Sequence, residues 1–154
     1  MNTLCRAALM AVLAAPTAGF SAVPGAAANG HCQPVGGSVF TNFVDQTDAA
    51  GPVSGDLAGA VSVEILAING NVYHIRKHFV TTSGDTMTVA DTDFTTYPTS
   101  VSGLAAATEP MNITGGTGRF DGATGSVTFF GAINSGGEVT LRYSGTICFK
   151  PGKQ

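Results

Sequence analysis

Two aspartates that share one face of an expected strand are the first candidates for chemistry. Asp91 and Asp93 lie two residues apart in the stretch 86–97, and side chains alternate between the two faces of a strand. If that face pointed into the core, desolvation and mutual repulsion would favour the protonated carboxyl groups that acid–base catalysis needs. The opposite orientation, with Phe94 inside and both aspartates in water, is the favoured alternative.

Glu64 is another isolated acid, set between Val63 and Ile65 in an apolar stretch. Its expected face is mixed in polarity, so the pattern leaves open whether the carboxylate points inward. That face carries Ala60, Ser62, Leu66 and Ile68. We therefore keep Glu64 and Asp91 as candidate catalytic acids, either of which would serve as the polar anchor of an apolar pocket.

Two histidines form an H-x-x-x-H pattern, which on a helix would suggest a metal site. His74 and His78 instead fall in a stretch with strand character, where four residues span about 13 Å and cannot share an ion without a bulge. No metal site is expected here. The opposite face of the same strand is the more apolar and is expected to point inward; it carries Tyr73, Ile75, Lys77 and Phe79.

A glycine-dense segment, 113–125, is the most distinctive stretch of the chain. It resembles a phosphate-binding loop, but Asp121 stands where the G-x-G-x-x-G pattern needs its last glycine, and no Lys-Ser or Lys-Thr pair follows. The segment is better interpreted as a compact turn, because its glycines accept positive φ without steric cost. Phe120 is its one large apolar side chain and is expected to pin the turn onto a core.

The remaining sequence has the period of strands. Glycine, threonine and valine dominate, and no stretch beyond the first residues shows the apolar spacing of a helix, so the chain is predicted to be all-β. Asn69-Gly70, Ser83-Gly84 and Gly136-Gly137 are hairpin signals. Seven strands are expected, or eight if one splits: 35–44, 56–68, 72–82, 86–97, 109–113, 126–134 and 138–149.

The first 28 residues have the pattern of a secretory signal peptide. A short start with Arg6 precedes an apolar run, and Ala26-Ala27-Ala28 supplies an A-x-A cleavage site. We expect a secreted protein, extracellular or periplasmic and free of the membrane after cleavage, with 29–154 as a single domain. The mature chain keeps six basic and ten acidic side chains, a net charge of −4, which argues against nucleic acid as a partner.

Two cysteines remain after this cleavage. Cys32 lies near the start of the mature chain and Cys148 near its end, and an exported protein meets oxidising conditions, so one disulfide is expected. The alternative, a nucleophilic thiol, has little support because neither cysteine has a basic neighbour in sequence.

Long strands joined by tight turns, with their two ends tied together, predict a closed barrel, since closure leaves no unpaired edge. About eight antiparallel strands would form it, and 98–108 would be a loop over one mouth. A barrel of this size either fills its interior with side chains or holds one small ligand. Ile65, Phe79 and Tyr143 are the expected ligand-binding residues if a pocket exists.

The glycine segment also carries a family resemblance. Its first part, Ile113-Thr114-Gly115-Gly116-Thr117-Gly118-Arg119-Phe120, resembles the I-x-G-G-T-G-[KR]-F turn common late in the allene oxide cyclase and dirigent-protein β-barrel superfamily, here as a bacterial-type secreted member. Segments 55–59 and 78–85 look like the strands that precede this turn in those proteins. The resemblance covers roughly 35–149.

The resemblance implies a function that composition does not supply. Allene oxide cyclases close a ring in a reactive epoxide and dirigent proteins orient phenoxy radicals, both inside a barrel and without a cofactor. Of the polar pocket residues of dirigent proteins, only an aspartate is carried over, to Asp56. Two hypotheses follow: a secreted barrel that binds or isomerises a small apolar molecule, with oligomerisation possible, or a non-catalytic structural or interaction protein with a filled barrel.

The cysteine pairing can be tested by mass. We expect no alkylatable thiol in the non-reduced mature protein and two after reduction, because Cys32 and Cys148 pair. Two free thiols under non-reducing conditions would exclude this closure, which the chain-entropy model values at roughly 4–5 kcal/mol for so long a loop.

Overall fold

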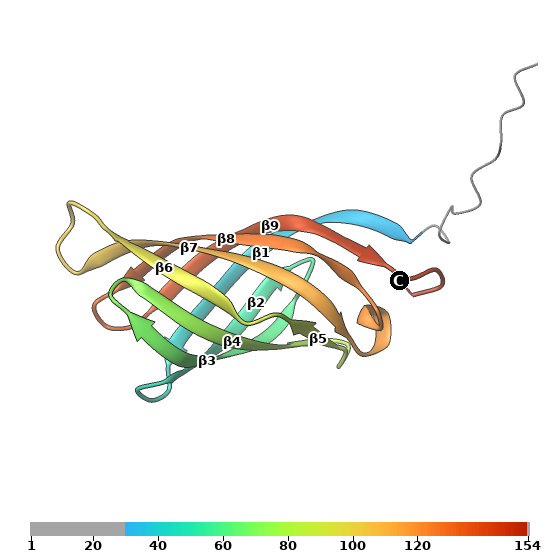
Figure 1. The fold of residues 1–154 in the computed structure, drawn as a ribbon, viewed down its shortest axis with the longest axis horizontal. Helices are drawn as coiled ribbons and strands as arrows, with labels where there is room; N and C mark the ends of the chain where they lie inside the picture. Colours follow the sequence, from blue (N-terminus) through green and yellow to red (C-terminus); the bar gives the residue numbers. More distant parts are fainter. Residues whose placement is uncertain (1–29, 154) are drawn as a thin grey trace, which may run out of the picture.

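A computed structural model describes residues 30–153 of the chain (Figure 1). The predicted signal peptide, 1–28, lies outside the described residues. Within them the chain forms nine β-strands and one short 3-10 helix, η1 (Gly118–Phe120), and none of the described helical structure is long and apolar enough to cross a membrane. The strands are β1 (His31–Phe43), β2 (Asp48–Gly55), β3 (Gly59–Asn69), β4 (Val72–Thr81), β5 (Thr86–Val89), β6 (Thr92–Pro98), β7 (Leu104–Gly116), β8 (Thr124–Asn134) and β9 (Val139–Phe149).

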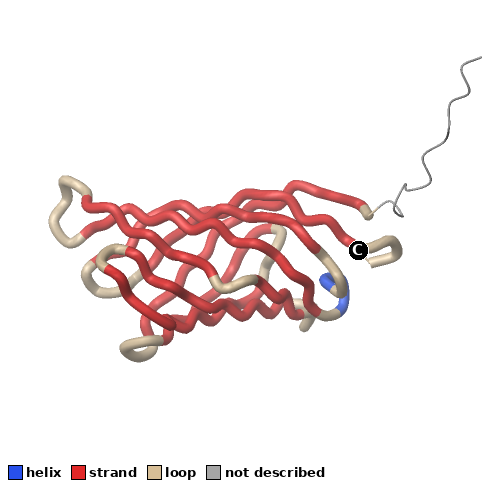
Figure 2. Tube along the Cα trace, viewed as in Figure 1, coloured by secondary structure: helices blue, strands red, loops and turns tan. Residues whose placement is uncertain are grey.

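The strands close into a single antiparallel barrel. Each strand pairs with the next along the chain, except that β5 and β6 share one position between β4 and β7, and β9 returns to pair with β1. Nine strands therefore occupy eight positions in the wall, and the prediction of a closed all-β barrel is confirmed. Figure 2 shows that most connections lie at the two ends of the barrel, whereas the break between β5 and β6 lies along the wall.

Four features of the strands differ from the sequence prediction. No strand is predicted at 48–55, where β2 forms, and the strand expected from Asp56 begins at Gly59. Gly51 and Pro52 hide β2 from propensity rules, whereas the fold uses Gly51 for close packing, since a Cβ there would lie 1.8 Å from the Phe40 carbonyl oxygen. The stretch 86–97 splits in two, and β7 begins at Leu104, so only 99–103 forms the loop.

The disulfide joins the first and last strands. Cys32 and Cys148 are cross-strand neighbours in the β1–β9 ladder, with a Cα–Cα distance of 3.9 Å, and their sulfurs are bonded. The predicted pairing is confirmed. It links residues 116 apart in sequence at the seam where the barrel closes.

One end of the barrel is plugged by side chains from its own turns. Leu57, in the β2–β3 turn, is 4% exposed, and Phe120 of η1 is fully buried, 5.8 Å between ring centroids from Phe149. Gly116 permits this turn, because its φ is +150° and a Cβ there would lie 2.0 Å from the Thr86 carbonyl oxygen. The compact turn and the burial of Phe120 are both as predicted, and we call this the plugged end.

The other end lies where β1, β3, β6 and β8 finish, at the left of Figure 1. The core side chains near this end are only partly buried, unlike those of the plugged end. They are Val63, Ile65, Tyr73 and Ile133. We call it the open end.

Truncation of Phe120 tests how far the plug stabilises the fold. We expect Phe120→Ala to lower the free energy of unfolding by about 3–5 kcal/mol, because a fully buried aromatic ring is lost. The matched control is Phe130→Ala, at a position 62% exposed on the outer wall, which we expect to change stability by no more than about 0.5 kcal/mol. Urea denaturation measures both, and equal midpoints for the two variants would contradict this account.

Candidate functional site

Two of the candidate catalytic acids lie on the outside of the barrel. The Arg76 guanidinium donates to both oxygens of Asp91, at 3.1 and 3.0 Å, and lies 3.4 Å from the Glu64 carboxylate. The side chains of Glu64 and Asp91 are 47% and 35% exposed. Asp93 faces outward too, 3.0 Å from His74, while Phe94 is buried as the favoured alternative required. These carboxylates form a solvated ion-pair network and do not anchor an interior pocket.

Asp56 lies at the plugged end. It stands in the β2–β3 turn and not in a strand, and its carboxylate accepts a hydrogen bond of 2.8 Å from the Gly36 amide. The Arg119 guanidinium donates to the backbone oxygen of Asp56 at 3.2 Å. Asp56 therefore stabilises the turn that carries Leu57 into the plug. It does not line the pocket, where the sequence resemblance had placed it.

The histidines follow the predicted alternation. His74 and His78 both point away from the core, on the same outer face as Arg76. Within residues 30–153 no group of three or more His, Cys, Asp or Glu side chains is arranged to hold a metal ion.

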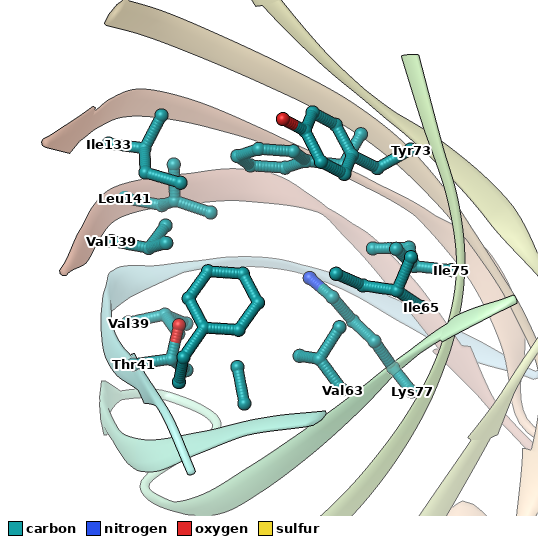
Figure 3. Close-up of a pocket in the computed structure, with 13 residues that line it drawn as sticks. Val39, Thr41, Val63, Ile65, Tyr73, Ile75, Lys77, Ile133, Val139 and Leu141 are labelled. Atoms are coloured by element: carbon teal, nitrogen blue, oxygen red, sulfur yellow. The ribbon is translucent and has the colours of Figure 1, made fainter. Parts of the chain in front are cut away.

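The interior opens into a pocket at the open end. Its wall is apolar except for Thr41, Tyr73 and Lys77, and its volume is about 50 Å³, which exceeds the roughly 10–15 Å³ that a cavity needs to hold one water. Figure 3 shows the side chains of several strands converging on it. The lining residues are Val39, Thr41, Phe43, Ala49, Val63, Ile65, Tyr73, Ile75, Lys77, Phe94, Ile133, Val139 and Leu141.

One of the three expected ligand-binding residues lines this pocket. Ile65 does, whereas Phe79 and Tyr143 belong to the packed core and are not among its lining residues. The Tyr143 hydroxyl accepts from the Leu57 amide and donates to the Ser54 carbonyl, each at 2.9 Å, so it braces the plug. Burial raises the pKa of Tyr143, and the Leu57 amide opposes this by stabilising the phenolate.

One lining residue, Lys77, belongs to a buried ion pair. Lys77 reaches inward from β4, and its ammonium lies 2.5 Å from the carboxylate of Glu109 on β7. The two side chains are 4% and 0% exposed. The ammonium also lies 4.4 Å from the centroid of the Phe129 ring, a cation–π distance. In Figure 3 the Lys77 nitrogen points in among the apolar side chains of the pocket.

The Glu109 carboxylate is incompletely satisfied. Its Oε2 accepts from Lys77, but its Oε1 is buried and has no hydrogen-bond partner among residues 30–153. Burial raises the pKa of Glu109, and the neighbouring ammonium of Lys77 opposes the shift without cancelling it. The pair is thus the one place on the described interior where a proton has a short path between two side chains.

Alternation in the sequence predicted the inward position of Lys77 but was not applied to Glu109. Alternation correctly placed Lys77 on the inward face with Ile75 and Phe79, and a buried ammonium requires an acid. Glu109 alternates with Ala107 and Met111, which marks it as the inward-facing acid of its strand. The predicted strand, 109–113, contains Met111 but leaves out Ala107, because β7 begins at Leu104.

Comparisons with known proteins do not establish a family for this chain. No protein-family model matches the sequence, and no curated protein matches it. One similar solved structure is that of the pterocarpan synthase dirigent protein GePTS1, at 14% identity and a TM-score of 0.36, covering 88% of this chain and 99% of that chain. At that level of similarity the site must be interpreted from its own geometry.

Removal of one or both charges tests whether the pair is coupled. Lys77→Met should lower the free energy of unfolding by about 3–5 kcal/mol, because it leaves the Glu109 carboxylate buried without its partner. The double variant Lys77→Met/Glu109→Leu should recover most of that loss or exceed the parent stability. Urea denaturation of the parent, both single variants and the double variant gives the coupling energy, and additive losses would contradict a coupled buried pair.

Proposed function

We propose that this is a secreted β-barrel protein that binds a small apolar organic molecule in the pocket at the open end. The observation that carries the proposal is the position of Lys77, whose buried ammonium faces a largely apolar pocket next to partly buried rim residues. Such a pocket supplies apolar contact area together with a few polar groups, namely Lys77 and the hydroxyls of Thr41 and Tyr73, the combination typical of small-molecule sites.

The ion pair is better explained by binding than by stability. A buried salt bridge contributes little net stability, because desolvation of both charges offsets their attraction, and apolar replacements are often as stable. Lys77 has one oxygen acceptor among the described residues, so N–H capacity remains for an acceptor atom of a ligand. The charge of the pair is already balanced, which favours a neutral ligand oxygen over an anion.

The pocket size limits what enters. A cavity of about 50 Å³ is well below the roughly 300–1,000 Å³ of pockets that enclose drug-sized ligands, so one end of the ligand would enter and the rest would lie across the rim. Phe43, which is 36% exposed, and the partly buried Tyr73 and Ile133 offer apolar surface for that remainder.

The disulfide between Cys32 and Cys148 supports export, since such bonds persist in oxidising compartments. A ring-closing or stereo-directing role, as the sequence resemblance implies, would use the same pocket. In that role Lys77 and Glu109 would lie beside the ligand, in place of Asp56, Glu64 and Asp91.

The alternative is a non-catalytic structural or interaction protein with a filled barrel. The packed half of the interior favours it, because Phe129, Tyr143 and Phe120 fill the space between the ion pair and the plugged end. The binding function requires an accessible pocket at the open end, and the filled-barrel alternative does not. A binding experiment therefore distinguishes them.

Titration with neutral probes tests the proposal. We expect benzyl alcohol and indole to shift the backbone amide NMR signals of Val63, Ile65, Lys77 and Leu141, because these residues line the pocket. Val63→Phe, which fills the pocket, should weaken binding at least about tenfold, or by roughly 1.4 kcal/mol. Ser62→Ala, on the outward face next to it, is the matched control and should bind like the parent.

Two results would contradict the proposal. One is the absence of shifts at millimolar probe in a protein whose spectrum shows that it is folded. The other is a set of shifts that survives Val63→Phe, which would place the binding elsewhere and favour the filled-barrel alternative.

A further inference from the structure

We propose that Lys77 is a reactive amine that captures small neutral aldehydes as an imine in the pocket, with Glu109 as its proton partner. The inference rests on the binding function proposed above and deepens it, because it assigns the ligand class and a covalent step to the same site.

Lys77 is buried and also lines a pocket, the position in which a lysine amine can react with a carbonyl group. Lysine amines become nucleophilic in desolvated apolar pockets, where the charged form loses its hydration. Lys77 is 4% exposed yet lines a pocket that opens to solvent, so a small molecule can reach its nitrogen without unfolding of the barrel. The pocket around it is largely apolar, with Val63, Ile65 and Ile75 among its lining residues, and the hydroxyls of Thr41 and Tyr73 are its other polar groups.

Glu109 can take the proton that Lys77 must lose. Its Oε2 already contacts the ammonium at 2.5 Å, and its Oε1 is buried without a partner among the described residues. Because burial favours the protonated carboxyl group, transfer of the proton produces a neutral amine beside a neutral acid, at no cost in net charge. An aqueous lysine lacks any such fixed partner.

The step balances in atoms and charge. The proton moves from the Lys77 ammonium to Glu109, and the free amine adds to the aldehyde carbon to give a carbinolamine. Glu109 then returns its proton to the carbinolamine hydroxyl, water leaves, and a protonated imine forms opposite the Glu109 carboxylate. One C–N double bond replaces one C–O double bond, one water is released, and no oxidant or reductant is needed.

The geometry also selects the kind of carbonyl compound. An anionic aldehyde would add an unbalanced charge to a pair that is already neutral, and burial makes this unfavourable. A pocket of about 50 Å³ admits only a small group, so the carbonyl end of the aldehyde would enter and its apolar substituent would extend toward the rim. The structure thus assigns a neutral, monofunctional aldehyde with an apolar body.

The other lysines provide an internal comparison. The chain has three, and Lys150 and Lys153 lie on the surface near Asp121, with side chains 59% and 45% exposed. On accessibility alone these two should react first. Preferential reaction at the buried Lys77 would therefore require activation by its site.

Reductive trapping tests the inference. The protein is incubated at neutral pH with benzaldehyde and cyanoborohydride, which adds hydride to the imine carbon, and the benzylated residue is located by peptide mass spectrometry. We expect Lys77 to be modified at least tenfold faster than Lys150 or Lys153. The double variant Lys77→Met/Glu109→Leu, which keeps the interior uncharged and is expected to fold, should lose this fast modification, and Val63→Phe should slow it by blocking access.

Benzyl alcohol distinguishes this inference from the proposed function, because it has the shape of benzaldehyde without the carbonyl group. If benzyl alcohol shifts the pocket amides but benzaldehyde labels only the N-terminal amine, Lys150 and Lys153, the covalent step is wrong and binding stands. If neither probe acts at the pocket, both the step and the binding function are wrong. Fast labelling of Lys77 that persists in Val63→Phe would also overturn the inference, since the amine would then react by a route other than the pocket.

Discussion

Closure of the sheet is the constraint on which the other features of this protein depend. β1 and β9 pair from His31↔Phe149 to Thr41↔Val139, so the last strand completes the hydrogen bonding of the first. Without that seam both strands would expose unpaired backbone edges, and the inward faces would meet water. The bond between Cys32 and Cys148 holds the same seam covalently and limits how far it can separate in the unfolded chain.

Closure then makes the two ends of the interior different. At the plugged end, Leu57, Phe120 and the braced hydroxyl of Tyr143 fill the space, and the glycine turn brings η1 close enough to pack. At the open end the turns between the described strands contribute no comparable plug, and side chains such as Ile65 and Tyr73 remain partly buried around a cavity. A barrel of this size can be solid or hollow, and this one is solid at one end only.

The ion pair sits at the boundary between these two regions. Lys77 lies over the ring of Phe129, which also packs against Tyr143 at 5.7 Å between centroids, so the pair lies against the packed layer and Lys77 faces the cavity. Because the two charges are buried together, anything that binds to Lys77 also changes the environment of Glu109. This coupling is the physical basis of both functional proposals.

The sequence by itself determined the strand period, the hairpins at Asn69-Gly70 and Ser83-Gly84, the cysteine pairing and the inward face of β4, because each depends on local alternation, turn chemistry or chain ends. It did not reveal β2, whose Gly51 and Pro52 oppose strand propensity and which is held by its two neighbours. Nor did it determine which acid enters the barrel. Glu64, Asp91 and Glu109 all lie in stretches with strand character, and only strand register and closure turned the first two outward and set Glu109 against Lys77.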